Sequence, residues 1–193
     1  MRIISGKFRG KKLHSSDHLL GLRPTTDKNR ESLFNILISG KFTKEINFKV
    51  AEADILDVCC GTGSVAFECL SRDAKSAFLI DDNSFHLNLA KKNSELLKVE
   101  QKCQFLLCDV KTDLPQSPKK FDLIFIDPPY AEDYKAIINN LVEKKWITKT
   151  SLVAIEFNSI NQLKDFGVEN FTAFDLRKYG KTSFAFLKLA KSI

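Results

Sequence analysis

The chain has 193 residues, of which 44% are hydrophobic and 28% are charged, proportions typical of one folded domain. No apolar run approaches the roughly 18 residues of a membrane-spanning helix, and the first residues turn polar too early for a signal peptide. The net charge of +6 lies in the N-terminal quarter, because residues 1–50 hold 11 Lys and Arg against 4 Asp and Glu. We therefore expect a cytoplasmic protein with no membrane partner, whose basic quarter meets a phosphate backbone or is a solvated charged face.

The cysteines and histidines indicate no metal or disulfide chemistry. The five cysteines are an odd number without Cys-x-x-Cys spacing, and the three histidines are not grouped with them. We therefore expect reduced thiols and no metal site, and we interpret Cys59 and Cys60 as small apolar side chains rather than nucleophiles.

The N-terminal residues predict a basic ribbon. Residues 2–13 alternate crudely between apolar and basic positions and are interrupted by Gly6 and Gly10. Such a ribbon is not stable alone, so it lies against the main domain or is ordered by a partner such as RNA. We therefore divide the chain into a basic N-terminal β-ribbon arm, residues 1–26, and a main domain, residues 27–193. The candidates for RNA contact are the basic residues Arg2, Lys7, Arg9, Lys11, Lys12 and Arg23.

The main domain begins with a helix and then alternates strands with helices. Thr26 or Asp27 can cap a helix that continues to Leu37. Strands are predicted at about 54–59, 76–81, 103–108, 121–126 and 151–156, with helices near 64–72, 83–98 and 132–145. Two strand-like runs, 171–176 and 183–189, end the chain. The sequence therefore predicts an α/β fold with a doubly wound, mostly parallel sheet and an antiparallel C-terminal hairpin at its edge.

A glycine turn follows the first predicted strand. The apolar run at 54–58 contains Asp57 and leads into a turn with Gly61 and Gly63 before the next helix. Glycines allow backbone N–H groups to approach a ligand closely, because they carry no Cβ. Asp57 can hold this turn by accepting backbone N–H groups or face a positively charged ligand. With Ala66, and with Asp81 placed 18 residues after the second glycine, the turn also fits a loose dinucleotide fingerprint, so NAD remains an alternative ligand.

Two further carboxylates end predicted strands. Asp81 ends the second strand, where it can accept hydrogen bonds from both hydroxyls of an adenosine ribose or can act as a charge at the start of the next helix. Asp109 follows the third strand, where it can face the amino group of an adenine or serve only as a turn residue. Both positions favour a ligand at the carboxyl edge of the sheet.

Asp127-Pro128-Pro129-Tyr130 closes the fourth predicted strand. The two prolines fix an extended segment, so the carboxylate of Asp127 and the carbonyl of Pro128 can point at one amino group. Two acceptors that take hydrogen bonds from both N–H groups of an amino group favour its pyramidal form, in which the nitrogen is a better nucleophile. Tyr130 supplies a flat face on which an unstacked base can lie. A rigid turn is the alternative interpretation of the same four residues.

Together these stretches resemble the bacterial 16S rRNA guanine-N2 methyltransferase (RsmD) family of class I methyltransferases. The matches are spread over almost the whole chain. They are Arg2 to Ile4 with Gly6 and Gly10, Arg23 to Asp27 with Arg30, Glu31 and Leu33 to Asn35, Asp57 to Gly63, Glu68 with Leu70 to Arg72, Asp127 to Tyr130, and Lys178 to Gly180 with Thr182. The resemblance implies a Rossmann-like fold and transfer of a methyl group from S-adenosylmethionine to the exocyclic N2 of a guanine in small-subunit ribosomal RNA. The cofactor-binding residues that we predict are Asp57, Gly61, Gly63, Asp81, Asp109 and Thr26, and the catalytic residues are Asp127, Pro128, Pro129 and Tyr130. The expected partner is ribosomal RNA, in the small subunit or its assembly intermediate, and the expected state is a monomer.

Three positions depart from the family pattern. Cys59 and Cys60 stand where the family more often has Phe-Ala, Asp73 stands where glycine is usual, and Asp81 stands where Glu is frequent. These differences concern the cofactor turn rather than the reaction class. Three alternatives remain at this level: methylation of adenine N6, an NAD-dependent oxidoreductase, and a non-catalytic RNA-binding protein.

Overall fold

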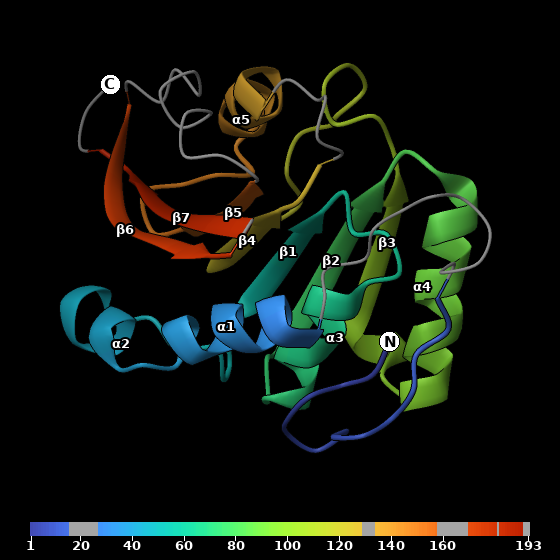
Figure 1. Cartoon of the computed structure of the whole chain (residues 1–193). Coiled ribbons are helices and arrows are strands. Elements are labelled where there is room, and N and C mark those ends of the chain that lie inside the picture. The colour runs from blue at the N-terminus through green and yellow to red at the C-terminus, as the bar shows by residue number, and fades with distance from the viewer. Residues whose placement is uncertain (16–26, 129–133, 158–169, 181, 191–193) are drawn as a thin grey trace.

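The computed structural model describes residues 1–15, 27–128, 134–157, 170–180 and 182–190 (Figure 1). The helices and strands in these residues are α1 (Asp27–Leu37), α2 (Lys41–Ile46), β1 (Asp54–Val58), α3 (Ser64–Ser71), β2 (Ser76–Asp81), α4 (Ser84–Leu97), the 3-10 helix η1 (Glu100–Lys102), β3 (Cys103–Leu107), β4 (Leu123–Ile126), α5 (Tyr134–Glu143), β5 (Leu152–Phe157), β6 (Phe171–Tyr179) and β7 (Thr182–Leu189). The predicted strands and helices are confirmed to within a few residues. The short helix α2 was not predicted.

The described strands form one sheet in the order β3-β2-β1-β4-β5-β7-β6. β1 lies between β2 and β4 and is parallel to both, with Val58 opposite Ile80 on one side and Ile126 on the other. β7 is antiparallel to both β5 and β6, so the predicted C-terminal hairpin is confirmed. The chain leaves β1 toward β2 and β3 and returns to β4 on the other side. The carboxyl ends of β1, β2 and β4 therefore meet at one edge, at the point where ligands bind in open α/β sheets.

Helices cover both faces of the sheet (Figure 1). On β1, Ile55 packs with apolar side chains of α1 to α4, whereas Leu56 packs with those of α5 and with Trp146. Both Ile55 and Leu56 are fully buried, and full burial of such a side chain contributes roughly 1.5–3 kcal/mol. Continuous apolar strands rather than alternating ones were the sequence signal for this doubly covered sheet.

The N-terminal segment, residues 1–15, lies against the main domain. A single bridge joins Arg2 to Lys12, and the residues between them form turns, so the predicted two-stranded ribbon is not confirmed. Ile3 and Leu13 are buried in the same core as α1, α3 and α4. In Figure 1 the segment runs past α3 and then along α4. The segment is therefore packed into the domain over its described length.

The fold explains one departure from the family pattern. Asp73 has a φ of 66°, in the left-handed region that favours glycine. Aspartate is among the few other residue types that tolerate this conformation. Asp73 therefore keeps the turn after α3 that a glycine would form. None of the described helices is long and apolar enough to cross a membrane.

Candidate functional site

The glycine loop, residues 59–63, connects β1 to α3 and is held by β2. The carboxylate of Asp81 accepts a hydrogen bond of 2.7 Å from the backbone N–H of Gly61. The N–H of Cys60 donates to Ile80 O at 3.0 Å, and the N–H of Gly63 donates to Cys60 O at 2.8 Å. These bonds fold the loop back over the carboxyl end of the neighbouring strand.

The two glycines of the loop serve different purposes. Gly63 has a φ of 76°, and a Cβ there would lie 2.6 Å from the ring of Phe67, so a larger residue does not fit. Gly61 has a φ of 54°, but a Cβ there would meet nothing within 4 Å. The side of Gly61 is thus open, which is where a ligand can approach the loop backbone.

Asp57 lies beneath the loop and is almost completely buried. One carboxylate oxygen accepts a hydrogen bond of 3.1 Å from the N–H of Ala66 in the first turn of α3. Burial raises the pKa of Asp57 well above its usual range, the Ala66 hydrogen bond opposes this rise, and the charges of Asp127 and Asp81 add to it. Three carboxylates thus interact at this edge, which favours a positively charged ligand.

Asp127 follows β4 at the same edge. Its N–H donates to Val58 O at 3.4 Å, and the following Pro128 is buried. The structure thereby brings together five of the predicted residues, which are Asp57, Gly61, Gly63, Asp81 and Asp127. Four others, Arg23, Thr26, Pro129 and Tyr130, lie outside the described residues.

Asp109 lies beside this group, in the turn after β3. The preceding N–H, of Cys108, donates to Asp81 O at 3.1 Å. The carboxylate of Asp109 accepts a hydrogen bond of 2.9 Å from the N–H of Lys111, as turn residues do. The turn role is therefore present, and the adenine-binding role stays a prediction.

Two α4 residues that the sequence analysis does not predict as site residues contact this region. His86 Nδ1 lies 3.4 Å from the carboxylate of Asp81, and both side chains are mostly buried. Asn93 is completely buried, and its amide nitrogen donates to Thr62 O at 3.0 Å. Their only signal in the sequence is the spacing of seven residues, which places both on one face of a helix.

The cysteines have the environment of apolar side chains. Cys59 has a φ of 58° at the start of the loop, and burial raises the pKa of its thiol, with Asp81 and Asp127 adding to the effect. Burial likewise raises the pKa of Cys60 well above its usual range and that of Cys103 to about 12. These thiols are protonated at neutral pH and poor nucleophiles. Within the described residues no group of three or more His, Cys, Asp or Glu could hold a metal ion.

The predicted RNA-contact residues of the N-terminal segment are exposed but spread out. Arg2 contacts Asp27 at the start of α1, at 3.3 Å. Lys7 lies at the C-terminal end of α3, whereas the glycine loop lies at its N-terminal end. The backbone N–H of Lys7 donates to Ser71 O, and its ammonium group pairs with Asp73 at 3.3 Å. An eight-residue helix is roughly 12 Å long, so Lys7 is about that far from the glycine loop. The remaining predicted residues here, Arg9, Lys11 and Lys12, are exposed along the same segment.

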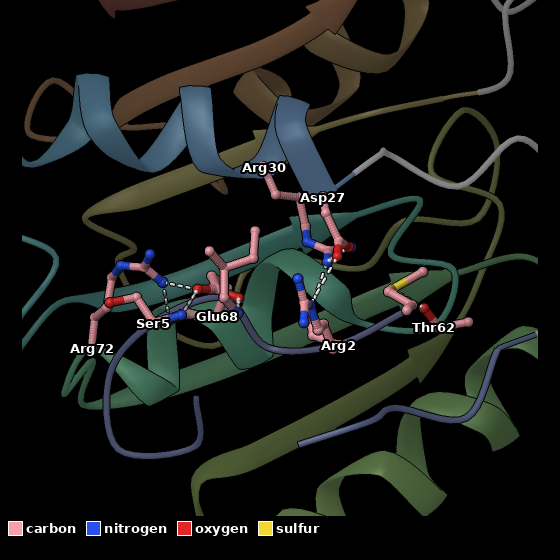
Figure 2. Close-up of polar contacts among 9 residues, drawn as sticks. Arg2, Ser5, Asp27, Arg30, Thr62, Glu68 and Arg72 are labelled. Atoms are coloured by element: carbon pink, nitrogen blue, oxygen red, sulfur yellow. Dashed lines mark hydrogen bonds and ion pairs between the residues drawn. The ribbon is translucent and has the colours of Figure 1, made fainter. Parts of the chain in front are cut away.

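Buried charges hold the N-terminal segment in place (Figure 2). Glu68 in α3 is fully buried, pairs with Arg72, and accepts hydrogen bonds of 2.9 Å from the N–H groups of Ile4 and Ser5. Arg30 in α1 is also buried and donates to Arg2 O and to Asp27, each at 2.7 Å. Burial lowers the pKa of Arg30, and the nearby carboxylates of Asp27, Glu68 and Glu156 oppose the shift. Removing one partner of such a pair is costly.

Known proteins are similar to this chain in both sequence and fold. A family model described as "Conserved hypothetical protein 95" matches residues 1–188. Ribosomal RNA small subunit methyltransferase D of Haemophilus influenzae is 32% identical over 160 residues, which are 81% of this chain and 78% of that protein. The protein of the same name from Escherichia coli is 32% identical over 164 residues, 84% of this chain and 77% of that protein.

The chain belongs to the ribosomal RNA small subunit methyltransferase D family. The solved structure of yhhF from Escherichia coli, a candidate methyltransferase, covers 100% of this chain and 99% of its own, with a TM-score of 0.82 and 28% identity. A candidate methylase from Haemophilus influenzae covers 98% of both chains, with a TM-score of 0.74 and 27% identity. The resemblance predicted from the motifs and the Rossmann-like class I fold are both confirmed.

The protein is therefore a methyltransferase, and its cofactor is S-adenosylmethionine. The described site fits this molecule, which carries positive charge on its sulfonium and amino groups. Asp81 and Asp127 supply negative charge at this edge, beside the buried Asp57, and the open side of Gly61 lets the loop backbone approach a ligand. The alternative of NAD is set aside by the family.

Proposed function

We propose that the protein transfers the methyl group of S-adenosylmethionine to the exocyclic N2 of a guanine in small-subunit (16S) ribosomal RNA. The observation that carries the proposal is the position of Asp127, which follows β4 and interacts with Asp57 beneath the glycine loop. This position places a carboxylate at the carboxyl edge of the sheet, where we propose that the cofactor binds. The relatives named small subunit methyltransferase D support ribosomal RNA as the substrate.

The chemistry follows from what an exocyclic amino group needs. Its lone pair is delocalised into the base, so it is a poor nucleophile until the nitrogen becomes pyramidal. The carboxylate of Asp127 and the carbonyl of Pro128 accept hydrogen bonds from its two N–H groups. These hydrogen bonds favour the pyramidal geometry and offset the positive charge that develops on nitrogen. The cofactor supplies an activated methyl group, and the chain supplies alignment and negative charge.

The remaining parts of the proposal concern the substrate. Tyr130 stacks on the target base after it leaves its helix, and Thr26 contributes to cofactor binding. Arg2, Lys7, Arg9, Lys11, Lys12 and Arg23 contact RNA phosphates. The substrate is the small subunit or its assembly intermediate, and the protein acts as a cytoplasmic monomer.

Single-turnover methyl transfer to small-subunit particles tests the proposal, with the product nucleosides identified by mass spectrometry. We expect N2-methylguanine from the wild-type protein. Asp127→Ala should lose at least about 100-fold in turnover while S-adenosylhomocysteine still binds, because the contact strengthens as the nitrogen becomes pyramidal. Asp127→Asn should be intermediate, since its amide oxygen accepts one hydrogen bond but carries no charge.

Asp82→Asn is the matched control, because Asp82 is exposed and also follows a strand of the same sheet. It should retain the wild-type rate. A near-normal rate for Asp127→Ala would remove Asp127 from the mechanism. N6-methyladenine as product would keep the mechanism and overturn the guanine assignment.

A further inference from the structure

The side chain of Asn93 joins two parts of the molecule that are far apart in sequence. Asn93 lies in α4 and has no exposed surface. Its amide nitrogen donates to Thr62 O and to His14 O, each at 3.0 Å, and its oxygen accepts a hydrogen bond of 2.7 Å from the N–H of His14. Both amide hydrogens are thus used, one on the glycine loop and one on the N-terminal segment.

These bonds fix the loop peptide that follows Thr62. The carbonyl of this peptide is held by Asn93, and its N–H, on Gly63, donates to Cys60 O at 2.8 Å. Because a peptide group is planar, holding both ends fixes its orientation. The conformation of the glycine loop therefore depends on where the Asn93 amide lies.

The same amide fixes the N-terminal segment. Its two bonds to His14 use both the N–H and the carbonyl of that residue, as a neighbouring strand would. A second contact reinforces the link, because the hydroxyl of Thr62 donates to the sulfur of Met1 at 3.7 Å.

We propose that Asn93 is a positioning residue that couples the N-terminal segment to the glycine loop, so that ordering of residues 1–14 and binding of S-adenosylmethionine stabilise each other. A buried amide with both hydrogens in hydrogen bonds cannot release one side without leaving a buried polar group unsatisfied, which is unfavourable. The coupling is reciprocal by linkage. Where the segment contacts RNA, a point that rests on the proposed function, RNA binding and cofactor binding are cooperative.

Hydrogen exchange of the wild-type protein tests the coupling without any substitution. The probes are the amides of Ile3, bonded to Lys11 O, and Leu13, bonded to Met1 O, neither of which contacts Asn93. Saturating S-adenosylhomocysteine should slow their exchange by about fivefold or more. The reference is the amide of Phe48, bonded to Phe42 O beside α2, at the end of the domain away from α4 (Figure 1). A response at Ile3 and Leu13 no greater than at Phe48 would overturn the proposal.

Substitution then assigns the coupling to Asn93. Asn93→Ala should weaken binding of S-adenosylhomocysteine by about fivefold or more in calorimetry, and the cofactor should no longer slow exchange at Ile3 and Leu13. Asn93→Asp should weaken it at least as much, because it places an acceptor against Thr62 O and His14 O. Unchanged affinity for a folded Asn93→Ala protein would refute the assignment.

Ser94→Ala is the matched control. Ser94 is also buried, but its hydroxyl donates only within its own helix, to Lys91 O at 2.7 Å. Its affinity and exchange response should remain within about twofold of wild type. Neither measurement uses RNA, so failure of the coupling is distinguishable from failure of the proposed guanine methylation.

Discussion

The carboxylate of Asp81 holds the backbone N–H of Gly61 at 2.7 Å, so the acid that ends β2 determines the shape of the loop that follows β1. The other oxygen of the same carboxylate accepts a hydrogen bond of 3.0 Å from the N–H of Asn83. One side chain therefore connects the loop, the strand and the start of α4.

Asp81→Ala should weaken binding of S-adenosylhomocysteine. It removes the predicted ribose contact and releases the N–H of Gly61, and charge-assisted bonds of this kind contribute about 1.5–3 kcal/mol, or about 10–100-fold in affinity. Calorimetry measures the effect. Asp82→Ala is the control, since Asp82 is adjacent and exposed. An affinity unchanged by Asp81→Ala would exclude Asp81 from the cofactor site.

The stability of the protein without cofactor should depend on Asp57 and on pH. Burial raises the pKa of Asp57 in the folded state, so the folded protein retains a proton that the unfolded chain has released. The free energy of unfolding therefore falls as pH rises above about 4, the ordinary pKa of Asp, by up to about 1.4 kcal/mol per pH unit until the folded pKa is passed. Asp57→Asn, which still offers an oxygen to the N–H of Ala66, should remove this slope. Urea unfolding from pH 4.5 to 7.5 measures it, and parallel curves for both proteins would contradict the expectation.

Gly6 and Gly10 form a matched pair for testing how tightly the N-terminal segment packs. Both have a φ of 82°, but a Cβ at Gly6 would lie 1.9 Å from Ser71 O, whereas one at Gly10 would meet nothing within 4 Å. Gly10→Ala should cost only the backbone strain of about 1–2 kcal/mol. Gly6→Ala should cost about 2–4 kcal/mol, because backbone atoms must move. Equal losses of stability in urea unfolding would show that the contact with α3 contributes little.

Substitution, rather than truncation, is the appropriate test of RNA contact by the N-terminal segment. Removing the first dozen residues would delete Ile3 from the core together with the charges. Replacing four exposed basic residues of the segment by Gln leaves the core intact. These residues are Lys7, Arg9, Lys11 and Lys12. RNA affinity should fall, and the slope of log K against log salt should decrease by about 0.7–0.9 for each phosphate that the segment no longer neutralises.

The control for this test removes the same charge from other parts of the protein surface. The exposed residues replaced by Gln are Lys44, Lys49, Lys145 and Lys149. Their replacement lowers the net charge of the protein by the same amount. If RNA affinity depended only on net charge, both variants would lose affinity to the same degree. Equal slopes for the two variants would therefore rule out specific binding of phosphates by the segment.

The sequence alone determined the sheet and the acids at its edge. Apolar runs such as Ile55 to Val58 and Leu123 to Ile126 are continuous because both faces of a parallel strand are buried, and this local pattern can be read without knowing the partners. Asp57, Asp81 and Asp127 then fall together because parallel strands share one carboxyl edge.

Only the tertiary structure decided how the N-terminal segment sits and which helix residues support the loop. The alternation of apolar and basic residues in residues 2–13 predicts a strand or hairpin, but turns through Gly6 place this stretch against the end of α3 instead. The sequence around Asn93 does not distinguish it from other polar helix residues. Neighbours within one or two helical turns do not reveal whether a polar side chain faces solvent or the backbone of another segment. The partners of Asn93, Thr62 and His14, are 31 and 79 residues away. Hydrogen bonds across such separations form only after packing has excluded water, so no local periodicity records them.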